Sequence, residues 1–369
     1  MPKNLIIAAL SVRAYAHAAK DCGYDVIALD AFTDADTQQV AAQAFKIKMN
    51  AQEVNADDFK HIFSQINLDE VEGFLYGSLF DNTPDLLTWV AERVRLLGNT
   101  PTVMQTAKSY AFFKLLDELQ IKHPEVSLAK PLGSESWLSK QIGGTGGTHV
   151  KPAAQGKAGS YYQRKIDGVP VSMLFAADGK SVQIIGFNQQ FVAPTIEMPY
   201  RFAGAVNNIA MQPNINAAFE HAAQQLTIKL GLCGINSLDA ILDKNSVNGD
   251  ELWILELNPR LCATFHLYES LLPLHMHSCA GDLKDSTSPL GISRAQMILY
   301  ADKALEITEY FVWPGWAADI PAIEGAASSV KITRNSPICS VLAEGETASI
   351  AHALVLQRAE KLREMLSND

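Results

Sequence analysis

The chain has 369 residues, 48% of which are hydrophobic, and a formal net charge of −10 at pH 7. A chain of this length and composition can bury a sizeable core in two or three domains, which excludes a largely disordered protein. The acidic balance argues against a nucleic-acid partner, and no apolar run is long enough to span a membrane. Five widely spaced cysteines, without a signal-peptide pattern, predict a cytoplasmic protein with reduced thiols.

The amino-terminal part predicts a β-α-β unit. Residues 5–10 and 25–30 are expected to be apolar strands, and residues 13–22 between them favour a helix. Asp30 ends the second strand, where a dinucleotide-binding enzyme would contact ribose. The first turn, at 11–14, has no glycine that would let a pyrophosphate approach the backbone, so we exclude an NAD site.

A helix is expected next, and it begins at Thr102 or Thr106. Its predicted apolar side comprises Tyr110, Phe113, Leu116 and Leu119. Lys108 lies near the start of this helix. From the pattern alone, Lys108 is either a binding residue or a lysine on a solvated helical surface.

A glycine-rich run follows at 143–148, preceded by Lys140. Glycines let backbone amides approach phosphate oxygens closely, and the lysine adds a positive charge. The run fits neither a P-loop nor a Rossmann fingerprint, and a flexible hairpin without a ligand is the alternative. Residues 161–175 then predict two strands around an Asp167-Gly168 turn.

Two alternating apolar segments, 234–243 and 252–258, predict a β-hairpin joined by polar, turn-rich sequence. If the turn is symmetric about 247–248, Asp239 lies directly opposite Glu256. Two facing carboxylates repel unless a cation lies between them. The hairpin is therefore either a cation site or an acidic surface feature without a ligand.

Side-chain alternation places Glu256 and Asn258 on one face of this hairpin. The residues expected with them are Leu252 and Ile254, and those expected on the other face are Trp253, Leu255 and Leu257. Oxygen donors from Asp, Glu and Asn side chains suit Mg²⁺ or Mn²⁺.

An Asp on one strand, followed by a hydrophobic-Glu-x-Asn-Pro-Arg run on the next, resembles the metal-binding end of the ATP-grasp superfamily. The resemblance implies that Asp239, Glu256 and Asn258 bind Mg²⁺ or Mn²⁺. It also implies catalytic roles for Arg260 and Lys140, and the glycine-rich run resembles the lid loop of these enzymes. The residues implied to bind ATP are Lys108, Lys140, Gly143, Gly144, Thr145, Gly146, Gly147, Gln163, Arg164, Lys165 and Ile166.

The resemblance also implies a mixed α/β and α+β architecture. A Rossmann-like pre-ATP-grasp domain is expected at 1–98, with strand ends near Ser11 and Arg13 that line a second-substrate pocket. The ATP-grasp domain with its lid is expected at 99–290. Residues 291–369 resemble the carboxy-terminal β-rich segment of biotin-carboxylase-related carboligases and end in an amphipathic helix.

The implied function is an ATP-dependent ligase that joins a small carboxylate to an amine through an acyl phosphate, with release of ADP and phosphate. Cofactor biosynthesis and a homodimer are part of this expectation. One alternative is a carboxylase-like enzyme that uses bicarbonate, and another is a non-catalytic nucleotide-binding regulator. Arg201 is either a carboxylate-binding residue or a surface arginine. The 275–279 segment, with two histidines and a cysteine, is expected to be a structural loop and not a zinc site.

Overall fold

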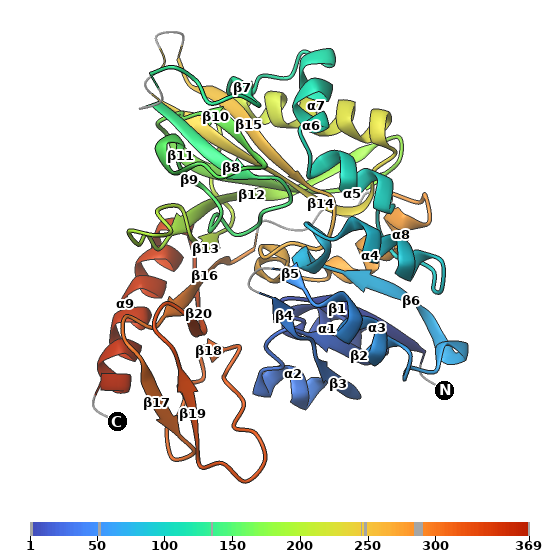
Figure 1. Cartoon of the computed structure of the whole chain (residues 1–369), viewed down its shortest axis with the longest axis vertical. Coiled ribbons are helices and arrows are strands. Elements are labelled where there is room, and N and C mark those ends of the chain that lie inside the picture. Colours follow the sequence, from blue (N-terminus) through green and yellow to red (C-terminus); the bar gives the residue numbers. More distant parts are fainter. Residues whose placement is uncertain are drawn as a thin grey trace.

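The described residues of the computed structural model are 3–50, 53–133, 136–244, 246, 249–283 and 291–367. Figure 1 shows an amino-terminal part in blue and a carboxy-terminal segment in orange and red, which lie side by side below a large central sheet. Within the described ranges, no helix is both long and apolar enough to cross a membrane.

The amino-terminal part is a parallel sheet with the strand order β3-β2-β1-β6. Side chains of β1 alternate between two cores: Leu5 and Ile7 pack with α1, whereas Ile6 and Ala8 pack with α3 and α4. The predicted β-α-β opening is therefore confirmed. The elements are β1 (Asn4–Ala9), α1 (Arg13–Asp21), β2 (Asp25–Asp30), α2 (Ala35–Val40), β3 (Gln43–Lys46), β4 (Met49–Asn50), β5 (Glu53–Val54), α3 (Ala56–Phe63), β6 (Val71–Tyr76) and α4 (Pro84–Ala91).

Two short helices follow where one was predicted. They are α5 (Pro101–Ala107) and α6 (Ala111–Glu118). Thr100 caps α5 and Pro101 occupies its first turn, where a missing N–H costs nothing, so the helix begins earlier than expected. Lys108 therefore lies at the carboxyl end of α5, and its predicted place near a helix start is wrong.

A small sheet with the order β7-β10-β8-β9 lies beside α6, where Tyr161 of β10 packs on Phe113; we call it the lid sheet, after the predicted lid. Its strands are β7 (Val126–Ser127), β8 (Trp137–Gln141), β9 (Lys151–Pro152) and β10 (Ser160–Arg164). The two strands predicted around the Asp167-Gly168 turn are present, but β10 belongs to the lid sheet and β11 to the central sheet. Residues 165–168 are thus a hinge between two sheets.

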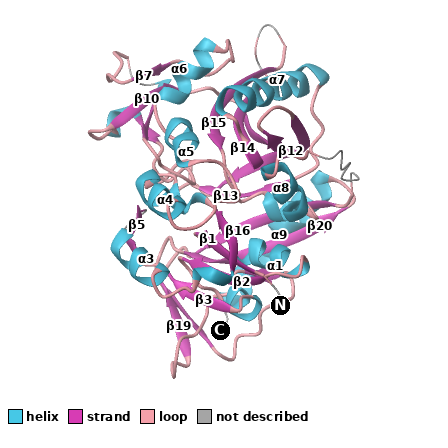
Figure 2. Cartoon of the chain, turned by 90° about the vertical axis from the view of Figure 1, so that its right-hand side faces the viewer, coloured by secondary structure: helices cyan, strands magenta, loops and turns pink. Residues whose placement is uncertain are grey.

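The central sheet has the order β15-β14-β11-β12-β13-β16-β20-β18. Met173 and Phe175 of β11 pack in one core with α5, α6 and α7, while Leu174 and Ala176 face α1 and α8. Figure 2 shows α7 above this sheet and α8 between the sheet and α1. The elements are β11 (Val169–Asp178), β12 (Val182–Val192), β13 (Phe202–Val206), α7 (Pro213–Leu230), β14 (Cys233–Asp243), β15 (Glu251–Asn258) and α8 (Leu271–Cys279).

The carboxy-terminal segment extends the central sheet and closes it with a long helix. Its elements are β16 (Ser293–Tyr300), β17 (Leu305–Thr308), β18 (Ala317–Ala318), β19 (Ser329–Ile332), β20 (Pro337–Gly345) and α9 (Ala348–Ser367). The buried face of α9 packs on β16 and β20, as expected for the predicted amphipathic helix. The 275–279 segment, predicted as a loop, lies in α8.

Candidate active site

The pairing of β14 with β15 brings two carboxylates together. Asp239 lies opposite Glu256 in the antiparallel register, so this prediction is confirmed. The turn at 247–248 on which the prediction depended lies outside the described residues.

A β-bulge in β15 overturns the predicted faces of that strand. Ala240 pairs with Ile254 and Asp239 pairs with Glu256, which leaves Leu255 as an extra residue. The extra residue reverses the alternation, so Leu255 and Glu256 line the same pocket. The core residues of β15 are Leu252, Ile254 and Leu257.

Asp239 is held by neutral donors. Its Oδ1 accepts hydrogen bonds from Gln190 Nε2 at 3.1 Å and Ser237 Oγ at 3.3 Å, and its Oδ2 accepts one from Asn258 Nδ2 at 2.9 Å. Burial, followed by the charge of Glu256, raises the pKa of Asp239 to about 6. Since the amide nitrogen of Asn258 is bound to Asp239, its oxygen faces the opposite side.

Lys108 reaches the other oxygens of the cluster. Its Nζ donates to Glu256 Oε1 and to Asn258 Oδ1 at 2.6 Å, and it lies 3.5 Å from Asp81 Oδ2. Burial alone would raise the pKa of Glu256, but the attraction of Lys108 outweighs it and the pKa is lowered. Glu256 is therefore an ionised carboxylate at neutral pH.

Asp81 anchors the site from the amino-terminal part, and sequence reasoning missed it. Its two oxygens accept hydrogen bonds from Arg260 Nε at 2.9 Å and Nη2 at 2.6 Å, which is a bidentate ion pair. The pKa of Asp81 is lowered because Arg260 and Lys108 together outweigh the effect of burial. One sequence signal was available, since Asp81 follows β6 at the carboxyl edge of a parallel sheet, where ligand sites form.

The donor set fits a hard divalent cation. The Glu256 carboxylate and the Asn258 oxygen meet at the Lys108 ammonium, and Asp239 lies opposite Glu256 and bonds the Asn258 nitrogen. The cluster thus offers oxygen ligands alone, which suit Mg²⁺ or Mn²⁺. In the described part of the chain, no group of three or more His, Cys, Asp or Glu side chains is arranged to hold a metal. The candidate site is therefore one that water and phosphate oxygens would complete.

The glycine-rich loop, 143–148, docks on the segment before β13. A Cβ on Gly147 would lie 1.9 Å from the carbonyl oxygen of Tyr200, so only glycine fits there. The carbonyl of Gly146 accepts a hydrogen bond from the Phe202 amide at 2.9 Å. The glycine-rich loop is therefore held against the segment before β13, and Gly143 and Gly144 at its start line the pocket that contains Glu256.

His149 packs beneath this loop and was not predicted from the sequence. Its ring fills the space where a Cβ of Gly144 would lie, at 2.2 Å, and its Nδ1 is buried without a hydrogen-bond partner in the described structure. Burial lowers the pKa of His149 to about 4, so the ring is neutral. The amide of Gly143 bonds to the carbonyl of Lys108 at 3.2 Å, which ties the loop to α5.

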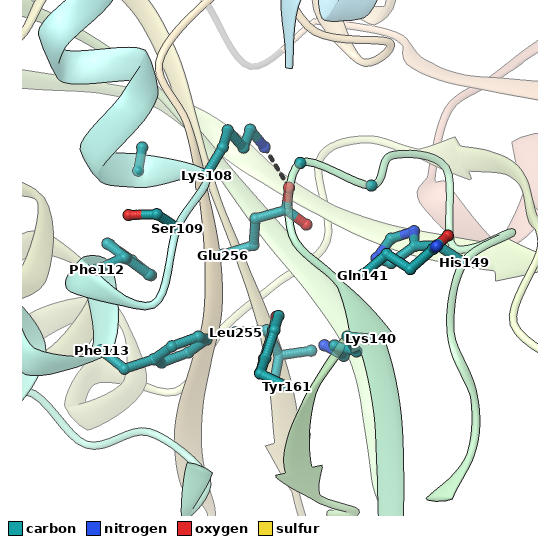
Figure 3. Close-up of a pocket in the computed structure, with 13 residues that line it drawn as sticks. Lys108, Ser109, Phe112, Phe113, Lys140, Gln141, His149, Tyr161, Leu255 and Glu256 are labelled. Carbon is teal, nitrogen blue, oxygen red and sulfur yellow. Dashed lines mark hydrogen bonds and ion pairs between the residues drawn. The ribbon is translucent and has the colours of Figure 1, made fainter. Parts of the chain in front are cut away.

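The pocket between the lid sheet and β15 is shown in Figure 3. Lys108 reaches Glu256 at one end, while Lys140 and Tyr161 lie at the other. Burial lowers the pKa of Lys140, against the opposing charges of Glu256 and Asp239. The free volume is about 30 Å³, far below the several hundred Å³ that ligand pockets usually provide. The space between these side chains is therefore too small for a nucleotide in this structure.

A second, open cavity of about 610 Å³ lies at the hinge. The predicted residues Arg164 and Ile166 line it, together with Trp253, over whose ring Lys122 lies at 4.2 Å. Gln163 is buried, and its amide nitrogen has no partner in the described residues. Lys165 pairs with Asp167 at 2.6 Å on the surface.

Residues expected around the second substrate lie where the amino-terminal part meets the carboxy-terminal segment. Arg13 Nε and Ser11 Oγ donate to Asp319 Oδ1 at 2.7 and 3.0 Å. Arg201 is buried and stacks on Tyr300 at 3.7 Å, while its donors bind backbone carbonyls. Arg201 is therefore neither a surface arginine nor part of the carboxylate cluster.

The sequence of the central part of the chain matches a known family model. Residues 106–264 match the family model of the ATP-grasp domain, and these residues form an ATP-grasp domain. The match confirms the predicted superfamily for this part of the chain, and the predicted ATP-dependent ligase class with its cofactors ATP and Mg²⁺ agrees with it. No curated protein sequence matches the chain significantly.

Solved structures share the fold over nearly the whole chain. The biotin carboxylase domain of 2-oxoglutarate carboxylase from Hydrogenobacter thermophilus has a TM-score of 0.72 and 13% identity, covering 95% of this chain and 88% of that one. N5-carboxyaminoimidazole ribonucleotide synthetase from Thermotoga maritima has a TM-score of 0.65 and 15% identity, and the match covers 97% of this chain and 98% of that one. Phosphoribosylamine–glycine ligase from the same organism has a TM-score of 0.69 and 14% identity, and the match covers 97% of this chain and 96% of that one. The predicted mixed α/β ATP-grasp fold is therefore confirmed.

Proposed function

We propose that this protein joins a small carboxylate to an amine at the expense of ATP, through an acyl phosphate, with release of ADP and phosphate. The observation that carries the proposal is the cluster in which Glu256 and the Asn258 oxygen meet the buried Lys108 ammonium, with Asp239 bonded to the Asn258 amide. Phosphoryl transfer requires this combination of a cation site and fixed positive charges.

In this proposal, Asp239, Glu256 and Asn258 hold Mg²⁺, which supplies charge stabilisation on the phosphate oxygens when bound. Lys140 and the amides of 145–147 bind and orient the same phosphates from the lid side, since the amides of Gly143 and Gly144 donate to protein carbonyls. The closed loop excludes water, which protects an acyl phosphate from hydrolysis. No protein nucleophile is required.

Arg260 is proposed to contact the acyl phosphate or the incoming carboxylate. Its Nε and Nη2 are bound to Asp81, and Nη2 also donates to Asn258 Oδ1 at 2.9 Å. The bidentate edge of the guanidinium is thus used within the protein. The donors that can meet a substrate belong to Nη1, whose contact with the Leu261 carbonyl is long, at 3.3 Å.

The base of the nucleotide is proposed to lie at the hinge. The open cavity there is lined by Arg164, Ile166 and Trp253, and a base stacked on Trp253 would take the place of Lys122, which lies over that ring. Aromatic faces bind bases by stacking. The amide nitrogen of Gln163, which has no partner among the described residues, is a further donor near this end.

The three-part division at 1–98, 99–290 and 291–369 is kept as a proposal, as are a homodimer and a place in cofactor biosynthesis. The described structure shows that β16 and β20 pair directly with the central sheet, so the third part shares a sheet with the second. The H. thermophilus biotin carboxylase domain was solved as a dimer, which supports testing for one here.

The first test is calorimetric titration with ATP, with and without Mg²⁺, of the wild type and Glu256→Gln. We expect Mg²⁺-dependent binding that the variant loses without unfolding. Glu360→Gln on α9 is the matched control, because Glu360 is exposed and pairs only with Arg363 in the described structure. Glu256→Gln is also expected to remove most Mg²⁺-dependent ADP release once an acid and amine pair is found. Unaltered binding and turnover in Glu256→Gln would contradict the assignment.

One alternative uses bicarbonate as the acid. The H. thermophilus biotin carboxylase domain was solved with MgADP, ADP and bicarbonate, which supports this candidate. Labelled bicarbonate that appears in a product during ADP release would favour it over carboxylate–amine ligation. A protein that binds Mg-ATP but releases no ADP with any acid and amine would be a non-catalytic regulator.

A further inference from the structure

All three N–H donors of the Lys108 ammonium face oxygen acceptors of the carboxylate cluster. An ammonium has three N–H donors, and three acceptors surround Nζ: Glu256 Oε1, Asn258 Oδ1 at 2.6 Å and Asp81 Oδ2 at 3.5 Å. The Lys108 side chain is only 4% exposed. Water therefore contributes little to its solvation, and the protein oxygens replace it.

Two of these three oxygens also belong to the candidate metal site. Mg²⁺ binds oxygen at about 2.1 Å, so a dication on Glu256 and Asn258 would lie within a few Å of the ammonium. Two cations so close in a buried site repel strongly. The dication and the Lys108 ammonium therefore compete for the same oxygens.

Departure of the ammonium leaves little else unpaired. Asp81 keeps its bidentate partner Arg260, and the Asn258 oxygen keeps its hydrogen bond from the same guanidinium. Glu256 is the group that loses the one cation it contacts directly. A divalent cation is the replacement that Glu256 then requires.

The backbone of Lys108 stays in place while its side chain can turn. Its amide bonds to Met104 O at 3.0 Å, and its carbonyl accepts from the Gly143 amide at 3.2 Å. The four-carbon stem allows the ammonium to swing from the carboxylates toward the glycine-rich loop, where the proposed phosphates lie. Lys108 and Gly143 line one pocket.

We propose that Lys108 is the resident cation of this site: its ammonium occupies the metal-ligand oxygens until a nucleoside polyphosphate draws it away, so a divalent cation binds tightly only together with the nucleotide. This inference rests on the proposed function, because it takes Glu256 and Asn258 as metal ligands. It makes the cation and the nucleotide mutually dependent ligands.

The test measures Mn²⁺ binding by electron paramagnetic resonance of the free ion, first without nucleotide. We expect Lys108→Met to bind Mn²⁺ about tenfold or more tightly than the wild type, because a buried positive charge is removed from the ligand oxygens. Lys108→Arg keeps the charge and is the matched control, so its affinity should stay as weak as that of the wild type. Equal affinities in the wild type and Lys108→Met would overturn the proposal.

A second measurement uses the wild type alone and does not depend on a variant that folds. Mn²⁺ by itself should leave the midpoint of thermal unfolding unchanged, whereas Mn²⁺ with ADP should raise it. A rise with Mn²⁺ alone, equal to that with both, would overturn the inference while leaving the ATP site intact. Failure of ADP to bind under any condition would instead refute the proposed function, and the gain of Mn²⁺ affinity in Lys108→Met would still report on the competition.

Discussion

Replacement of Asp81 by alanine should destabilise the fold through the charges it leaves behind. The Asp81 side chain is 1% exposed, and it accepts two hydrogen bonds from Arg260 and lies 3.5 Å from Lys108. Removal of one partner of a buried ion pair typically costs 3–5 kcal/mol, and we expect about 3 kcal/mol here. The lower end applies because Arg260 retains Asn258, and Lys108 retains Glu256.

The assay is urea unfolding followed by circular dichroism at pH 7, with Asp85→Ala as the matched control. Asp85 is an exposed acid in the first turn of α4, where its loss costs below about 1 kcal/mol. A loss in Asp81→Ala no larger than that in Asp85→Ala would refute the reasoning. If the cost comes from an uncompensated guanidinium, Asp81→Ala combined with Arg260→Met should cost less than the sum of the single changes, by on the order of 2 kcal/mol.

The pH dependence checks the same pair. Because the folded-state pKa of Asp81 lies below its ordinary value of 3.8, its ionised form stabilises the protein above that value. This contribution is lost as the pH falls through the folded-state pKa. The difference between wild type and Asp81→Ala should therefore be constant from neutral pH down to the ordinary value and shrink below it.

Two further changes probe the loop and the amino-terminal part. Gly147→Ala should undock the glycine-rich loop and lower ATP affinity, because its Cβ would meet the Tyr200 carbonyl. Gly146→Ala is the control, because Gly146 also has a positive φ but a Cβ there would meet open space. Equal ATP affinities of the two variants in a binding titration would contradict this. Burial, then repulsion from Asp319, raises the pKa of Asp34 to about 7, so stability falls as pH rises from the ordinary 3.8 to about 7. Asp34→Asn should thus gain stability relative to wild type across that window in pH-resolved thermal unfolding, and a difference that does not change with pH would contradict the assigned shift.

Local sequence patterns determined much of the fold. The β-α-β opening, the two alternating strands β14 and β15 and the final helix follow from periodicity within each segment. The opposition of Asp239 and Glu256 was predictable for the same reason, since a hairpin pairs residues that are close in the chain.

Only the tertiary structure decided how the site is held. Asp81 contacts Arg260, 179 positions away in the sequence, and Lys108 contacts Glu256, 148 positions away. The periodicity of a local segment cannot predict contacts at such separations. The bulge at Leu255 reversed the predicted faces of β15, because one extra residue shifts every later side chain to the other side. Sequence alone therefore determined the chemical types at the site and their order, while the packing of three sheets decided which charges face each other.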